Sequence, residues 1–248
     1  MVVVGLASFA FPRCFAGVAG YFMRWAKVPA DERERFDRVV DAREEAEGIS
    51  ANYGRLLGAI AIALAALETV RAVPFIVPYA VFCLAGATLT MLAYLQFRRA
   101  VERRVAPLVR RSPFTAFPPL IIAAVACSFF VALALAAYPP ERLGALAVAA
   151  STLVLGVIAW RVANAPAMLL GIDPQLEYAV DERVRICRAR TVANLACAPV
   201  FVTVVLVGPT LPAQYATFGN VATAIVAAAF VVTLAASFIP LRRPIIAA

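Results

Sequence analysis

The chain contains no histidine, and this absence excludes much enzyme and metal chemistry. Without an imidazole there is no histidine-based general acid or base, no histidine-ligated haem, and little scope for a transition metal. The five cysteines are scattered along the chain, at Cys14, Cys83, Cys127, Cys187 and Cys197. None belongs to a CxxC pair, so we expect neither structural disulfides nor a zinc site.

Charged residues are also scarce, at 15% of the 248 residues, whereas apolar residues make up 63% and the mean hydropathy is +0.86. Soluble domains have about 45–50% apolar and about 25% charged residues. A helix needs about 20 mostly apolar residues to cross a bilayer. Runs near that length occur at 52–70, 73–96, 117–138, 143–160, 192–207 and 218–239. The pattern predicts an all-α, polytopic integral membrane bundle in a single domain.

Residues 1–23 form a less regular apolar run, because Pro12 and Arg13 interrupt it. The run lacks the basic segment and the small-residue cleavage site of a secretory signal, so we expect it to belong to the mature chain. If residues 1–25 span the bilayer, seven transmembrane helices result. If they do not, the chain has six.

The basic residues predict the orientation of the helices. Of the 23 Arg and Lys residues, 20 fall in four segments, at 24–55, 98–111, 161–190 and 242–243. The hairpins between them hold only Arg71 and Arg142. By the positive-inside rule the charged segments are cytoplasmic, which places the C-terminus inside, at the inner (cytoplasmic) membrane. Anionic lipid headgroups account for the net charge of +8, so no nucleic-acid partner is expected, and the expected partner is the bilayer.

The pattern Asp-Glu-Arg-x-Arg-apolar-x-Arg occurs twice, at 31–38 and at 181–188. Each copy precedes two apolar runs joined by a short hairpin. We expect a parallel internal repeat in a 3+1+3 plan, an arrangement that some transporters use. Repeat A would cover 1–97, a linker helix 98–142, and repeat B 143–248. Chance similarity between charged segments beside a membrane is the alternative.

The apolar runs contain almost no ionisable residues, which argues against proton or sodium coupling through buried carboxylates. Polar uncharged residues such as Thr152 and Asn194 could line a path for a neutral solute. Such residues more often bond to neighbouring helices or to their own backbone carbonyls, and we favour that interpretation.

Two sets of carboxylates form the best candidate site. Asp173, Glu177 and Asp181 are spaced to share one helix face, and so are Glu34, Asp37 and Asp41. Two such faces at a membrane surface could bind Mg²⁺ and a diphosphate, with arginines adding phosphate contacts. We favour the other interpretation, in which these residues form two solvated amphipathic helices with internal ion pairs, near 30–47 and 173–190.

The string from Glu34 to Arg43, Glu-Arg-Phe-Asp-Arg-Val-Val-Asp-Ala-Arg, resembles the first aspartate-rich motif of the UbiA prenyltransferase superfamily, D-x-x-D-R-x-x-D. Gly171-Ile172-Asp173 and the segment Tyr-Ala-Val-Asp at 178–181 resemble its second motif. Four apolar runs separate the motifs, as in that family. The resemblance implies a Mg²⁺-dependent prenyltransferase acting on a prenyl diphosphate. It implies metal ligands at Asp37, Asp41, Asp173 and Asp181, and substrate contacts at Arg38, Arg43, Asn164 and Arg183.

The basic Arg-Thr…Arg-Pro element with which that family grips diphosphate is absent here. Our leading expectation is therefore a membrane protein without an evident catalytic centre, of an accessory or transport type with neutral or lipid-like cargo. The partner could be another membrane protein or a second copy of the chain. A retinal protein is excluded, because the only lysine is Lys27. Small sugar carriers of the SWEET type share only the topology.

Overall fold

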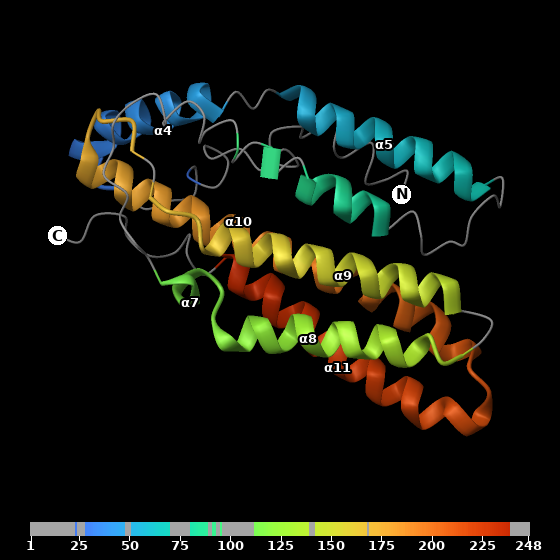
Figure 1. The fold of residues 1–248 in the computed structure, drawn as a ribbon. Coiled ribbons are helices and arrows are strands. Elements are labelled where there is room, and N and C mark those ends of the chain that lie inside the picture. The colour runs from blue at the N-terminus through green and yellow to red at the C-terminus, as the bar shows by residue number, and fades with distance from the viewer. Residues whose placement is uncertain are drawn as a thin grey trace.

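The computed structural model describes residues 28–47, 51–69, 80–88, 112–138, 142–167 and 169–238, together with Met23, Met91, Leu92 and Leu95. All regular structure in this part of the chain is helical (Figure 1). The α-helices with defined bounds are α4 (Arg33–Glu47), α5 (Ala51–Thr69), α7 (Pro113–Ala116), α8 (Pro119–Leu135), α9 (Arg142–Ala163), α10 (Pro174–Val207) and α11 (Ala216–Phe238), and residues 80–88 are also helical. Short 3₁₀ turns are η1 (Ala30–Glu32), η3 (Gly208–Thr210) and η4 (Ala213–Tyr215).

Among the described residues, three helical segments are long and apolar enough to cross a membrane: Arg142–Ala163, Pro174–Val207 and Ala213–Ser237. The shorter helix α8 is equally apolar and contains no charged residue. This confirms the all-α class and supports a membrane protein. The apolar runs at 52–70, 117–138, 143–160 and 218–239 each coincide closely with one helix. Apart from Met23, the predicted span at 1–23 lies outside the described residues, and so do the charged segment at 98–111 and the tail with Arg242 and Arg243.

Helix α10 is the centre of the bundle, since it packs against α9, α11, α8, α7 and α4. Its 34 residues correspond to about 51 Å at the usual rise per residue, more than the ~30 Å of a hydrocarbon core. All of its charged residues precede Thr191. The uncharged part, 191–207, is therefore the part suited to the hydrocarbon, and the charged part extends beyond it. The expectation of a separate amphipathic helix at 173–190 is wrong, because that segment and the following span form one continuous helix.

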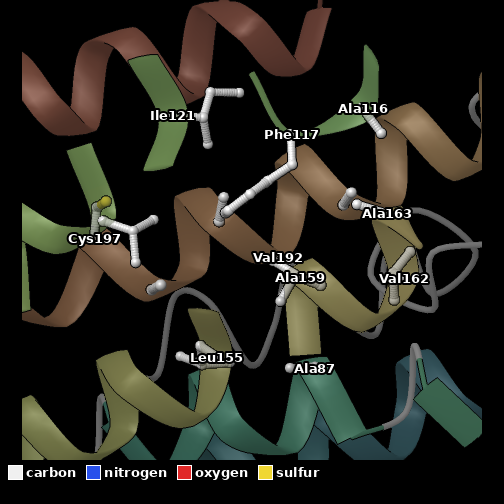
Figure 2. Close-up of a cluster of buried hydrophobic side chains, with 14 of the residues drawn as sticks. Ala87, Ala116, Phe117, Ile121, Leu155, Ala159, Val162, Ala163, Val192 and Cys197 are labelled. Atoms are coloured by element: carbon white, nitrogen blue, oxygen red, sulfur yellow. The ribbon is translucent and has the colours of Figure 1, made fainter. Parts of the chain in front are cut away.

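Small side chains allow the helices of this bundle to pack closely. The largest buried cluster among the described residues includes Ala159 and Ala163 of α9 and several alanines of α10, with Phe117, Ile121 and Val192 filling the space between them (Figure 2). Without a hydrophobic driving force between helices in lipid, this kind of backbone approach supplies much of the packing energy. Gly156 is one such contact, because a Cβ there would lie 3.1 Å from Cγ1 of Val125 on α8.

The two ends of the bundle differ in character. One end lies on the left in Figure 1. There α4 and α7 meet the C-termini of α9 and α11 and the charged half of α10. We call this the charged end. At the other, the hairpin end, the turn after α8 lies beside the start of α11, with the rings of Tyr138 and Tyr215 6.4 Å apart. In the part of the chain that the structure describes, the charged segments and the short hairpins therefore lie at two distinct ends of the bundle.

Candidate functional site

The charged end is built by docking α4 onto the first half of α10. Phe36, Val39 and Val40 recur at helical spacing on α4 and are buried. They pack against Leu176, Val180 and Val184, which form the matching stripe of α10. Burial of a large apolar side chain stabilises by about 1.5–3 kcal/mol, so this contact fixes which face of each helix turns inward.

Two ion pairs join the same faces. Arg43 Nη1 lies 2.6 Å from Asp181 Oδ1, and both side chains are at least nine-tenths buried. Arg35 pairs with Asp173 at the rim of the contact, where the arginine is half exposed. An exposed pair contributes about 0–1 kcal/mol. The buried pair is different, because losing one partner leaves a desolvated charge.

Glu177 organises the loop between α9 and α10. Its carboxylate accepts hydrogen bonds from the backbone N–H groups of Leu170, Gly171, Ile172 and Asp173. Gly171 has φ of +87°, a backbone conformation that costs glycine little and other residues more. Asp173 then caps α10 by accepting from the N–H of Leu176 at 3.4 Å. Two of the three acidic residues on this face are therefore bonded to backbone at the start of α10.

Two arginines of α10 bind the ends of neighbouring helices. Arg185 donates to the carbonyl of Ala163, the last residue of α9, and to that of Ser112 at 3.5 Å. Arg185 also pairs with Glu182, at 2.6 Å. Arg190 donates to the carbonyls of Thr115 and Ala116 at 3.2 Å and of Ala236 at 2.9 Å. Helix C-termini carry carbonyls without intrahelical partners, so these cations stabilise the termini of α7, α9 and α11.

The predicted metal ligands occupy different environments. Asp37 and Asp41 lie on the exposed face of α4, and Asp37 pairs with Arg33 at 3.3 Å. Asp173 and Asp181 lie two turns apart on α10 and face Arg35 and Arg43 of α4. Helix α4 thus turns Arg35 and Arg43, and not Asp37 or Asp41, toward α10. Within the described residues, no group of three or more Cys, Asp or Glu side chains is placed to hold a metal ion.

The predicted substrate contacts divide in the same way. Arg43 and Arg183 are buried, whereas Arg38 and Asn164 are exposed. Asn164 donates from its side-chain amide to the carbonyl of Trp160 at 2.8 Å, which makes it a local cap of α9. Two of the four residues are therefore buried in the packed end of the bundle, and two are exposed.

A cavity of about 10 Å³ lies beside the buried ion pair, lined in part by Arg43, Asp181, Arg185 and Arg188. That volume accommodates about one water molecule and is far smaller than a diphosphate. The residues present do not fit a magnesium–diphosphate unit in this arrangement, and we derive no catalytic step through one.

Sequence reasoning missed the structural roles of Glu177, Arg185 and Arg190. The arginines were expected on a solvated helix, but Arg185 is buried and Arg190 half-buried. One signal was available: the charged half of α10 also carries apolar residues at Leu176, Val180 and Val184, which marks a packed face. Nothing local in the sequence indicates that the arginines reach helix termini 22 to 75 residues away along the chain.

Polar side chains in the apolar helices are bonded locally or across one interface. Thr152 of α9 donates to its own helix at Val148 and lies 3.1 Å from the carbonyl of Ala196 on α10. Asn194 of α10 bonds to the carbonyl of Phe230 and the hydroxyl of Thr233 on α11, at 3.2 and 3.0 Å. These contacts confirm the interpretation of such residues as packing contacts for the pairs that the structure describes.

Comparison of the chain with known protein families, characterised proteins and solved structures gives no match.

Proposed function

We propose that this chain is a cytoplasmic-membrane protein without a catalytic centre of its own, acting as an accessory or transport-type component. One observation carries the proposal. Three of the four acidic residues that would have to hold a metal–diphosphate unit are paired with arginines: Asp37 with Arg33, Asp173 with Arg35 and Asp181 with Arg43. The charged end is then a structural clamp that holds helix termini together.

The expected topology forms part of this proposal. Six or seven spans in a 3+1+3 plan with parallel repeats agree with the two chemically distinct ends of the bundle. The copies of the repeated motif are used differently, however. Residues 31–38 begin at η1 and run into α4 with their arginines exposed, whereas 181–188 lie inside α10 with their arginines buried. If the repeat is real, the halves have diverged in how they use it.

The cargo, if the protein transports one, should be neutral or lipid-like. Within the described helices, residues 119–135, 143–160, 191–207 and 216–238 contain no Asp, Glu, Lys or Arg. A coupled ion pathway normally needs such groups. An accessory role with a membrane-protein partner or a second copy is the other form of the proposal.

The orientation can be measured directly. A reporter fused after Ala248 should be cytoplasmic. A cysteine placed at Thr210, at the hairpin end, should react with an impermeant reagent from outside, whereas one placed at Ser112 should not. The reverse labelling pattern would contradict the topology.

Activity separates the proposal from the prenyltransferase alternative. Purified protein in lipid vesicles should show no Mg²⁺-dependent prenyl transfer from a prenyl diphosphate. Transfer that is lost in both Asp37→Ala and Asp181→Ala would overturn our proposal. In the same vesicles, uptake of a small neutral solute or movement of a labelled lipid between leaflets would identify the transport form, and a chain that carries neither would act as an accessory.

A further inference from the structure

A groove of about 280 Å³ lies at the hairpin end, between the last turn of α8 and the start of α11. Ala134 in the last turn of α8 and Ala137 in the turn after it contribute small side chains, and the rings of Tyr138, Tyr215 and Phe218 line the groove as well. This site lies at the opposite end of the bundle from the charged end. Its volume is near the lower limit of small-molecule sites, about 300 Å³.

The lining indicates a hydrocarbon occupant. No charged side chain contributes to the groove, and the surrounding surface is also apolar, with Phe130 64% and Val221 52% exposed. Apolar cavities do not retain water favourably. In a protein whose adjoining helices face lipid, the groove is continuous with the surface that contacts acyl chains. Tyrosine rings at the end of such a surface are typical of the headgroup level.

One cation lies next to the groove. Among the described residues 133–138, 142–147 and 204–222, the sole charged side chain is Arg142. It is exposed, and its Nε donates to the carbonyl of Ala136 at 3.3 Å, next in sequence to Ala137 of the groove lining. This bond holds the guanidinium beside the mouth of the groove. A guanidinium binds phosphate oxygens with two parallel hydrogen bonds, which a lysine cannot match.

From this juxtaposition we propose that the groove is a binding site for one glycerophospholipid at the hairpin-end surface of the membrane. One acyl chain occupies the groove between α8 and α11, and the phosphate lies against Arg142. Tyr138 and Tyr215 contact the region between chain and headgroup. The inference rests on the proposed membrane location, because only a bilayer delivers such a ligand to this surface.

The test uses the full chain in detergent micelles with a tryptophan reporter. In the Phe218→Trp variant, brominated phosphatidylglycerol should quench the new fluorophore with half-saturation at a lipid fraction about tenfold below that for Val231→Trp. Val231, 60% exposed on the same helix, reports ordinary lipid contact. Tyr215→Trp serves as a second reporter if Phe218→Trp lowers the melting temperature.

Two further variants test the acyl-chain contact and the phosphate contact separately. Ala137→Leu should fill the groove and abolish the saturable quenching, whereas Ala224→Leu, at an exposed alanine of α11, should leave it unchanged. Arg142→Gln should weaken binding of phosphatidylglycerol about tenfold, the effect of one charge-assisted hydrogen bond, but not that of brominated diacylglycerol, which has no phosphate.

Equal quenching curves at positions 218 and 231, or saturable quenching that survives Ala137→Leu, would overturn the lipid site. Sensitivity of diacylglycerol binding to Arg142→Gln would also contradict it. Membrane integration is measured separately, as resistance of the expressed protein to alkaline carbonate extraction. Extraction by carbonate would contradict both the proposed function and this site, whereas the quenching outcomes test the site alone.

Discussion

Replacing Asp181 with alanine should lower the free energy of unfolding by about 3–5 kcal/mol, the usual cost of removing one partner of a buried ion pair. Asp181 and Arg43 are both buried, at 4% and 5% exposure, and their side chains meet at 2.6 Å. Without the carboxylate, the guanidinium stays desolvated between α4 and α10. For a chain of this size the melting temperature should fall by roughly 6–20 °C.

The matched control is Asp41→Ala, which removes an exposed carboxylate of the adjacent helix. It should change stability by less than about 0.5 kcal/mol. The double variant Arg43→Met/Asp181→Leu should recover most of the loss, because an apolar pair in place of a buried ion pair is often neutral or stabilising. Denaturant unfolding in detergent, followed by circular dichroism, gives all three values. If Asp41→Ala and Asp181→Ala cost the same, the described docking of α4 is wrong.

Hydropathy predicted the apolar helices well because the bilayer constrains them so strongly. Helices α5, α8, α9 and α11 begin and end within a few residues of the expected runs. The physical reason is that backbone polar groups in hydrocarbon must bond within their own segment, so an apolar run of sufficient length is nearly committed to a helix. The length of an apolar run then indicates where a helix begins and ends, and the charged residues distinguish the two ends of the bundle.

The candidate site was less predictable, because it depends on which helix faces meet. The spacing of Asp37 and Asp41 correctly places them on one face of α4. It does not indicate whether that face packs against α10 or faces solvent. Phe36, Val39 and Val40 decide it, since their burial against α10 rotates the aspartates toward solvent and Arg43 toward Asp181. An aspartate motif identified from its charged residues alone therefore leaves out the apolar residues that determine which way its helix faces.

The continuous helix α10 shows a second limit. Because one half of this segment is charged and the other apolar, the sequence predicted two separate helices. No glycine lies between Pro174 and Val207 to end the first helix, and Pro199 lies well inside the apolar half. Arg183, Arg185 and Arg188 are buried along the charged half, where they bring cationic groups into the packed end of the bundle. Charge density at a membrane surface is therefore not by itself a sign of a solvated helix.

The second large effect concerns Glu177, which is 4% exposed and accepts hydrogen bonds from four consecutive backbone N–H groups. Glu177→Ala should destabilise the protein by about 2–3 kcal/mol. An unsatisfied buried donor costs about 1–3 kcal/mol, but Gly171 and Ile172 are exposed enough for water to replace part of the loss. Glu177→Gln should retain about half of the stabilisation, because its amide keeps one acceptor oxygen and places a donor where an acceptor is needed.

Hydrogen exchange provides the site-specific measurement. The amides of residues 170–173 should exchange at least tenfold faster in Glu177→Ala, whereas those of α11 should change only as far as global stability does. Glu45→Ala, which removes an exposed carboxylate from α4, should leave the loop protected. Gly171→Ala should weaken the same loop by about 1 kcal/mol through its φ of +87°, without removing any hydrogen bond. Unchanged exchange at 170–173 in Glu177→Ala would show that the loop is held by its own backbone and by Arg35, and that the carboxylate is incidental to it.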